Sequence, residues 1–275
     1  MSENKYDAVL ITGNGFDLNL GLKTSYSYFI KSEIFNKMLT ADNQLCMHLK
    51  SQHELKNWID IENELKEYSN TVCKDSNRKI FRKEYQMLCN SLCEYLNSLE
   101  MSDINETSKA YEIMTKKFDN LLILNFNYTS SLEYISYQNK LNHKIVEVHG
   151  KAKENKIVFG VEDGARVNVN DVFLKKSTCL WNEIIDIRGI LSEADNILFL
   201  GYSLGETDHH YFNNFFRHDL LLSSLTQKAK NIVISYYQQD GKYEVLKQID
   251  SLTGHNIQTL RTKHNFTMFD LAEDK

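Results

Sequence analysis

The sequence contains no proline. Proline ends or kinks helices because it lacks a backbone N–H and its ring clashes with the preceding turn. Helical stretches are therefore easy to continue along this chain, although the absence of proline says nothing about function.

Cysteine is scarce and its spacing is uninformative. The chain has five cysteines, an odd number, and none of them forms a Cys-x-x-Cys motif. Neither a disulfide framework nor a zinc ribbon is predicted. Cys89 and Cys93 lie four residues apart on a predicted helix, a spacing that indicates packing.

Runs of positive charge and long apolar runs are also missing. The formal net charge is -5, and no cluster of Lys and Arg is dense enough to bind a nucleic-acid backbone, so nucleic acid is a poor candidate ligand. Residues 1–7 are polar, and the apolar stretch after them is too short for a secretion signal or a membrane span. We expect a cytoplasmic protein with no membrane partner. The apolar fraction of 42% and the charged fraction of 25% are typical of a soluble globular protein.

Short apolar runs alternate with helical patterns in the second half of the chain. Strands are predicted at residues 8–12, 121–124, 144–148, 156–159, 196–200 and 231–236. Helical patterns precede the last two, from about Leu180 and from Tyr211. This alternation predicts an α/β fold with a Rossmann-like, mostly parallel sheet.

Residues between the first two strands have helical spacing instead. A helix is predicted from Tyr26 to Phe35 after the capping pair Thr24-Ser25, another around Trp58 to Leu65, and a third over residues 78–99. We therefore predict a helical insertion at residues 31–118 in a sheet domain made of residues 1–30 and 119–275.

Four polar clusters directly follow apolar runs. Open α/β sheets bind ligands at the carboxyl ends of their strands, so we expect these clusters to converge on one nucleotide. They are Gly13-Asn14-Gly15-Phe16-Asp17, Asn125-Phe126-Asn127-Tyr128-Thr129, Val148-His149-Gly150 and Gly201-Tyr202-Ser203-Leu204-Gly205.

The first cluster resembles a dinucleotide fingerprint, in which the backbone approaches a pyrophosphate. Leu18 replaces the third glycine of that fingerprint, and no second strand follows that could carry a ribose-binding acid. A hydride-transferring dehydrogenase is therefore disfavoured. Taken alone, the loop is as compatible with a plain tight turn as with a phosphate cradle.

Two single residues are candidates for the chemistry. The amide of Asn127 can bind a ribose hydroxyl or hold a water molecule, and the alternative is a local turn that caps the helix beginning near Ser130. His149 stands at a strand end before Gly150, where an imidazole could act as a general base. The alternative is a structural histidine.

The last cluster also matches the Gly-x-Ser-x-Gly elbow of α/β hydrolases. Ser203 would be the nucleophile, and the other triad members would be Asp240 or Asp250 and His255 or His264. Asp208-His209-His210 lacks a third metal ligand at a recognisable spacing, so we assign Asp208 as a nucleotide contact.

The order of the clusters, with Gly-x-Gly first, then Asn, then His-Gly, then Gly-x-Ser-Leu, is that of sirtuins. The second cluster contributes Phe126-Asn127-Tyr128-Thr129, and two further motifs belong with the clusters, namely Gly21-Leu22-x-Thr24-Ser25-Tyr26 and Trp58-x-Asp60-Ile61-Glu62. Together they make the sequence resemble, over nearly its whole length, the phage abortive-infection family AbiH, a sirtuin-like group.

The resemblance implies roles by position. The loop from Gly13 to Asp17 would hold NAD phosphates, Asn127 would match the active-site Asn, and His149 would match the catalytic His. Gly201, Tyr202 and Ser203 would form a loop on the adenosine side, and Ser25 and Asp208 would add nucleotide contacts. The zinc-module cysteines are absent around Ile157 to Gly160, the sirtuin segment Gly-Ile-Pro-Asp-Phe-Arg does not follow Gly21-Leu22, and Thr129 stands where sirtuins have Asp. These departures disfavour deacylation and leave glycosidic cleavage of NAD.

We therefore expect an NAD glycohydrolase that releases nicotinamide and ADP-ribose and needs no metal. It would be a phage-defence effector restrained until infection, and a phage-derived or protein trigger and a homo-oligomer are the partners to test. Two alternatives stay open. One is a serine hydrolase built on Ser203, and the other is a sensor that binds NAD or an ADP-ribose-like nucleotide without cleaving it.

Overall fold

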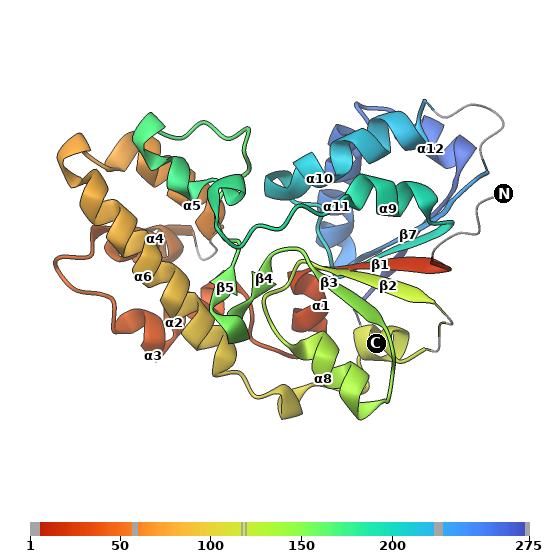
Figure 1. The fold of residues 1–275 in the computed structure, drawn as a ribbon, viewed down its shortest axis with the longest axis horizontal. Coiled ribbons are helices and arrows are strands. Elements are labelled where there is room, and N and C mark those ends of the chain that lie inside the picture. The colour runs from red at the N-terminus through yellow and green to blue at the C-terminus, as the bar shows by residue number, and fades with distance from the viewer. Residues whose placement is uncertain (1–5, 57–59, 117, 119, 223–227, 273–275) are drawn as a thin grey trace.

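A six-stranded parallel sheet forms the centre of the protein (Figure 1). The computed structural model describes residues 6–56, 60–116, 118, 120–222 and 228–272. Across the sheet the strands run in the order β3 (Lys144–Glu147), β2 (Leu121–Asn125), β1 (Ala8–Thr12), β6 (Asn196–Leu200), β7 (Asn231–Tyr236) and β8 (Asn265–Asp270). This is the doubly wound Rossmann order, which reverses between β1 and β6. The predicted fold class is confirmed.

Both faces of the sheet are covered, as its continuous apolar strands require. Val9, Ile11 and Leu124 face one core, whereas Leu10 and Ile123 face the other. The first core is closed by α9 (Ile187–Glu193), α10 (His209–Asn214), α11 (Gln238–Leu252) and α12 (Ile257–Lys263). The second is closed by α1 (Asn14–Asn19), α7 (Lys109–Met114) and α8 (Ser131–Gln138).

A separate core lies in the helical part drawn on the left of Figure 1. It is built by α2 (Tyr26–Lys31), α3 (Glu33–Asn36), α4 (Gln44–Lys56), α5 (Ile61–Glu67) and α6 (Arg78–Asn97). The hairpin β4 (Gly150–Lys151) and β5 (Lys156–Ile157) packs there too, with Phe159, Val161 and Leu174 after it. Residues 31–118 are thus divided between two cores, because α7 packs on the sheet.

Three sequence predictions need correction. The run at residues 156–159 is not a strand of the main sheet: only Lys156–Ile157 is extended, in the small antiparallel hairpin. Its apolar character comes from burial against α6, where the Tyr85 hydroxyl donates to the Phe159 carbonyl at 2.6 Å. The helix expected from Leu180 begins at Ile187, where the Asp186 side chain accepts from the Gly189 N–H.

The third correction concerns the helix predicted from Tyr26 to Phe35. Ser25 caps it as predicted, but the helix ends at Lys31, because Ser32 is extended and caps α3 in turn. Trp58 and Ile59 of the next predicted helix lie outside the described residues, and α5 begins at Ile61 after the capping residue Asp60. Strand β8 was not predicted.

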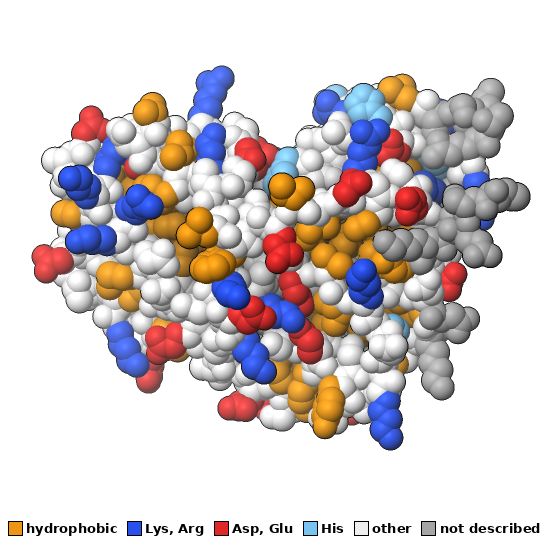
Figure 2. Space-filling model, in the orientation of Figure 1, with side chains coloured by type: hydrophobic (Ala, Val, Ile, Leu, Met, Phe, Trp, Pro, Cys, Tyr) orange, Lys and Arg blue, Asp and Glu red, His pale blue; other side chains and the backbone are white. Residues whose placement is uncertain are grey.

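The helical and sheet parts meet along a visible junction. In the space-filling view the outline is notched between α5 and α10, where the two parts come together (Figure 2). Among the described residues, no helix is both long enough and apolar enough to cross a bilayer.

Candidate functional site

The four polar clusters leave the sheet at one edge. Thr12 pairs with Asn125 on one side and with Leu200 on the other, and Asn125 pairs with Glu147. These four residues form the last shared rung of the parallel strands. Three of the clusters begin at the next residue and the second begins at Asn125 itself, so all four occupy the carboxyl edge where doubly wound sheets bind ligands.

The two glycine loops at this edge pack directly against each other. A Cβ atom on Gly15 would lie 2.8 Å from the Gly201 carbonyl oxygen, and one on Gly201, which has a φ of +61°, would lie 2.0 Å from the Phe16 nitrogen. A Cβ on Gly13 would lie 2.4 Å from Cδ2 of Tyr202. Contact between the loops therefore explains why residues 13, 15 and 201 are glycines. The Tyr202 ring lies against the backbone of Gly13, which was predicted to approach phosphates.

Other residues predicted to contact the nucleotide hold the loops in place. The buried Asp17 carboxylate accepts from the Thr129 hydroxyl at 2.7 Å and from the Ser131 hydroxyl at 2.6 Å. Burial raises the pKa of Asp17 to about 6, against the lowering effect of these two hydrogen bonds. Asn14 accepts from Thr24. Phe16 is fully buried in the core beneath the sheet and Ser25 caps α2.

Asn127 has an unsatisfied side chain. Asn125 makes the local turn, since its Oδ1 accepts from the Asn127 N–H at 3.1 Å and from Thr12 at 3.0 Å. The Nδ2 of Asn127 is buried without a hydrogen-bond partner. Buried polar groups are nearly always paired, so an unpaired amide at a strand end is a position that a ligand or water would satisfy. The alternative role as a helix cap is not what the structure shows, because Asn127 makes no capping bond and Ser130 precedes α8.

His149 also has an unsatisfied atom at this edge. Its ring lies among Phe126, Tyr128 and Tyr211, with the Phe126 ring 5.0 Å away and edge-on. The buried Nε2 lies 3.4 Å from Oδ1 of Asp208 but has no hydrogen bond. Burial, reinforced by the charge of Lys176, lowers the pKa of His149 to about 3, so the imidazole is neutral at physiological pH.

Asp208 is occupied by protein contacts on both oxygens. Oδ1 accepts from Lys176 Nζ at 2.8 Å, and Oδ2 accepts from the Tyr202 hydroxyl at 2.8 Å. Burial alone would raise the pKa of Asp208, but Lys176 and His149 lower it to about 2. Asp208 therefore positions Lys176 and Tyr202 and lies beside His149 without a hydrogen bond to it.

Two charged residues of the site were not singled out from the sequence. Lys176 opens the short 3-10 turn η6 (Lys176–Thr178), and its side chain is only 2% exposed. Its ammonium also lies 3.2 Å from Oε2 of Glu62, in the first turn of α5. Glu62 occurs in one of the motifs above, but nothing local to the sequence marks Lys176. We call Glu62, Lys176, Asp208 and His149 the junction cluster.

Glu62 is the titratable carboxylate of this cluster. Burial raises its pKa, Lys176 lowers it and Asp208 raises it again, which leaves it at about 7. Burial opposes the charge of Lys176, but the two carboxylates raise its pKa above the usual value, so the lysine stays protonated. Near neutral pH the cluster thus holds a fixed anion, a fixed cation, a neutral imidazole and one carboxylate that titrates.

The hydrolase triad does not assemble around Ser203. Ser203 is exposed and makes no hydrogen bond with the described residues. Backbone groups occupy both ring nitrogens of His264, since the Lys230 N–H donates to one and the Leu220 carbonyl contacts the other. His255 pairs with Asp250 at 2.6 Å on the surface.

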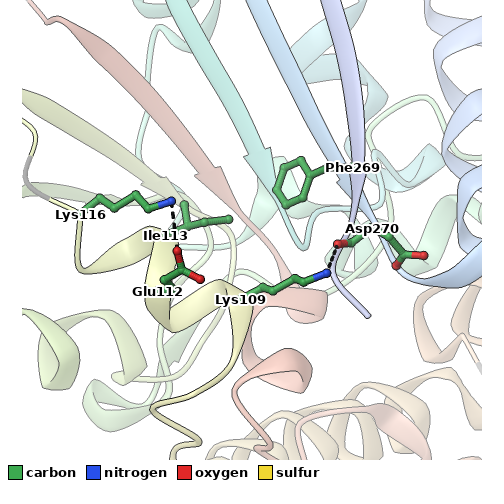
Figure 3. A pocket seen from close by; sticks show the side chains of 6 residues that line it. All are labelled: Lys109, Glu112, Ile113, Lys116, Phe269 and Asp270. Carbon is green, nitrogen blue, oxygen red and sulfur yellow. Dashed lines mark hydrogen bonds and ion pairs between the residues drawn. The ribbon is translucent and has the colours of Figure 1, made fainter. Parts of the chain in front are cut away.

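One pocket contains none of these residues (Figure 3). It lies between α7 and the end of β8, and its charged groups contact each other: Lys116 pairs with Glu112, and Lys109 donates to the Asp270 carbonyl. Within the described ranges, no group of three or more His, Cys, Asp or Glu side chains is arranged to hold a metal ion.

A protein-family model matches the part of the chain that contains the residues at the sheet edge. The family model described as bacteriophage abortive infection AbiH matches residues 9–236, from β1 to the last residue of β7. The matched range includes the four clusters and the whole junction cluster. No curated protein matches the chain. Because the family model covers well over half of the sequence, the chain belongs to the bacteriophage abortive infection family AbiH.

Proposed function

We propose that the protein is an NAD glycohydrolase acting as an effector of abortive infection. One observation carries the proposal: Asn127 Nδ2 and His149 Nε2 are both buried without a hydrogen-bond partner, and both follow neighbouring strands at the ligand-binding edge of a Rossmann-ordered sheet. They are also the two residues that the resemblance to sirtuins marks as active-site Asn and His. The family's link to abortive infection supports the biological role.

Correct positioning of the ribose and the attacking water matters more for this reaction than strong acid catalysis. Water adds to C1′ of the ribose that carries nicotinamide, while the C1′–N bond breaks and its electron pair neutralises the pyridinium nitrogen. The transition state resembles an oxocarbenium ion, as in other glycosidic cleavages. Asn127 would orient a ribose hydroxyl or the water, and the neutral imidazole of His149 would hold the substrate by a hydrogen bond.

His149 is a weaker base than the sequence alone suggests. General bases work best when their pKa lies near the operating pH, and a pKa of about 3 is far below it. Its assignment as the general base is therefore less favoured than a positioning role. The proton acceptor has to be sought elsewhere in the site.

The enclosure of the site supports an effector that is restrained until infection. Asn127 is 5% exposed and His149 is 4% exposed, and Tyr202 covers the Gly13 loop. NAD would enter after the helical and sheet parts separate at the notch of Figure 2, which is where a phage-derived trigger, another protein or a second copy of the chain would act.

The test is NAD consumption by purified protein with and without candidate triggers. Asn127→Ala should reduce turnover by about 10²-fold or more, on the scale of losing a group that positions reactants. Asn90→Ala is the matched control, because Asn90 is an exposed asparagine on α6. Equal turnover by Asn127→Ala and wild type would refute the assignment. Thermal stabilisation by NAD without product would favour the sensor instead.

A further inference from the structure

The junction cluster joins residues from three separate parts of the chain. Glu62 comes from α5 in the helical insertion, Lys176 from the segment after the hairpin, and Asp208 and His149 from the sheet domain. The contacts run in one line: Glu62 Oε2 to Lys176 Nζ at 3.2 Å, Lys176 Nζ to Asp208 Oδ1 at 2.8 Å, and Asp208 Oδ1 to His149 Nε2 at 3.4 Å. The insertion therefore contributes a carboxylate to the same charged chain as His149.

Stability alone does not explain this arrangement. Burying each ion costs several kcal/mol, and replacing such a group by well-packed apolar residues is often neutral or stabilising. Glu62 is 7% exposed and Lys176 is 2% exposed, so both bear this cost. Buried titratable groups with shifted proton affinities are instead enriched at functional sites.

The carboxylates of Asp208 and Glu62 differ in proton affinity, as the two members of a catalytic acid–base pair do. Asp208 accepts short hydrogen bonds from Lys176 and Tyr202 and stays ionised. Glu62 has an ion pair at 3.2 Å, a long contact of 3.5 Å with the Tyr26 hydroxyl and a hydrogen bond from Thr207, and its pKa is about 7. Where environments separate the proton affinities of two neighbouring carboxylates, the weaker acid is the one that exchanges a proton near neutrality. Here that residue is Glu62.

Neighbours on all sides of Glu62 are compatible with this role. Lys176 is the cation among the groups that interact with it, Asp208 and the N-capping Asp60 are the anions, and Thr207 donates a hydrogen bond. The remaining titratable neighbours are phenols, which stay protonated because burial raises their pKa values: Tyr26, Tyr85, Tyr128, Tyr202 and Tyr211.

We propose that Glu62 of the helical insertion is the proton acceptor of the reaction, taking the proton from the water that attacks C1′, and that Lys176 positions its carboxylate. The inference rests on the proposed NAD hydrolysis and adds the residue that this reaction needs. The water oxygen forms the new bond to C1′, its proton passes to Glu62, and the electron pair of the broken C1′–N bond leaves with nicotinamide. The insertion is then part of the active site.

The sign of the pH dependence follows from the carboxylate. A general base works in its ionised form, so turnover should rise with pH and level off above the Glu62 pKa of about 7. His149 is already neutral throughout this range and adds no second step to the profile.

The experiment is a pH–rate profile of NAD hydrolysis for wild type, Glu62→Gln and Glu64→Gln. Glu64 is a matched control because it lies on the same helix with the same 7% exposure but pairs with Lys56 and His48. Glu62→Gln should lose about 10²- to 10⁴-fold in rate and lose the rise near pH 7, whereas Glu64→Gln should keep the rise. Added formate should restore part of the activity of Glu62→Ala, which a purely structural role for Glu62 would not produce.

The outcomes separate this inference from the proposed function. If Glu62→Gln keeps the wild-type rate and profile, Glu62 is not the proton acceptor and NAD hydrolysis stands. If wild type consumes no NAD under any trigger, both proposals fail. Should Glu62→Gln not fold, Glu62→Asp decides, with a lower rate and a retained rise supporting the inference and a flat profile at wild-type rate contradicting it.

Discussion

Two buried ionic clusters connect the helical insertion to other parts of the protein, and they differ in kind. In the second cluster, Asp171 is fully buried, accepts from the Ser69 hydroxyl at 2.8 Å and pairs with Arg78. Arg78 also pairs with Asp75 and contacts the carbonyls of Ser69 and Cys73. An arginine is charged at every accessible pH, so the cation of this cluster is permanent.

The junction cluster instead includes Glu62, whose pKa is about 7, and lies at the carboxyl edge beside two unpaired polar atoms. The comparison teaches that buried charge is not by itself evidence of a site. An unsatisfied polar atom does not separate the two clusters, because Oδ1 of Asp171 is also buried without a partner. The informative features of the junction cluster are a group that titrates near neutral pH and a position at the ligand-binding edge of the sheet.

The largest combined effect is expected for Lys176→Met. Two carboxylates would remain buried without their cation, which should lower the free energy of unfolding by about 3–5 kcal/mol. Because Lys176 lowers the pKa of Glu62, its loss should also move the rise of the pH–rate profile to higher pH. Denaturant unfolding and NAD turnover measure the two effects. Lys175→Met is the control, since the Lys175 ammonium contacts only an exposed carbonyl, and an equal response from both variants would contradict the account.

A purely structural effect is expected for Asp171→Ala. Arg78 keeps Asp75 and two carbonyls, so the loss of unfolding free energy should be about 3 kcal/mol, the lower end of the range for a broken buried pair. The rate per folded molecule and its pH profile should not change. A shift of the profile in this variant would remove the distinction between the two clusters.

The smallest effect is expected at Ser203. It is exposed and lacks a histidine partner, so Ser203→Ala should change the unfolding free energy by no more than about 0.5 kcal/mol. A fluorophosphonate probe should not label wild-type protein at this residue. Labelling that disappears in Ser203→Ala would revive the serine hydrolase alternative.

Much of the fold could be predicted because its strands are continuous apolar runs. Ala8–Thr12 and Leu121–Asn125 are buried on both faces, and such runs are visible in the sequence. Strand β8 could not be found in this way, because it is a half-exposed edge strand of mixed polarity. The run that includes Val158 and Phe159 was wrongly predicted to be a strand of the main sheet. Its residues are apolar because they are buried against α6, and the sequence alone does not distinguish this from burial in a sheet.

The residues of the candidate site also differ in whether the sequence alone could identify them. Asn127 and His149 could be singled out because each follows an apolar run, and position along a strand is a local property. The link from Glu62 to Lys176 depends on tertiary contact between α5 and η6, which no local pattern records. The Gly13-x-Gly15 motif was assigned to phosphate binding, but contact with the Gly201 loop is sufficient to require those glycines.

The most direct measurement is the release of nicotinamide from NAD by wild type and by His149→Ala, with His255→Ala as an exposed histidine control. Wild type and His255→Ala should each release nicotinamide and ADP-ribose in equal amounts. Release from a His149→Ala protein that unfolds like wild type should be at least about 10²-fold slower, because the substrate loses a group that positions it. Undiminished release by His149→Ala, or no release by wild type with any trigger, would contradict the proposed role of His149 in NAD hydrolysis.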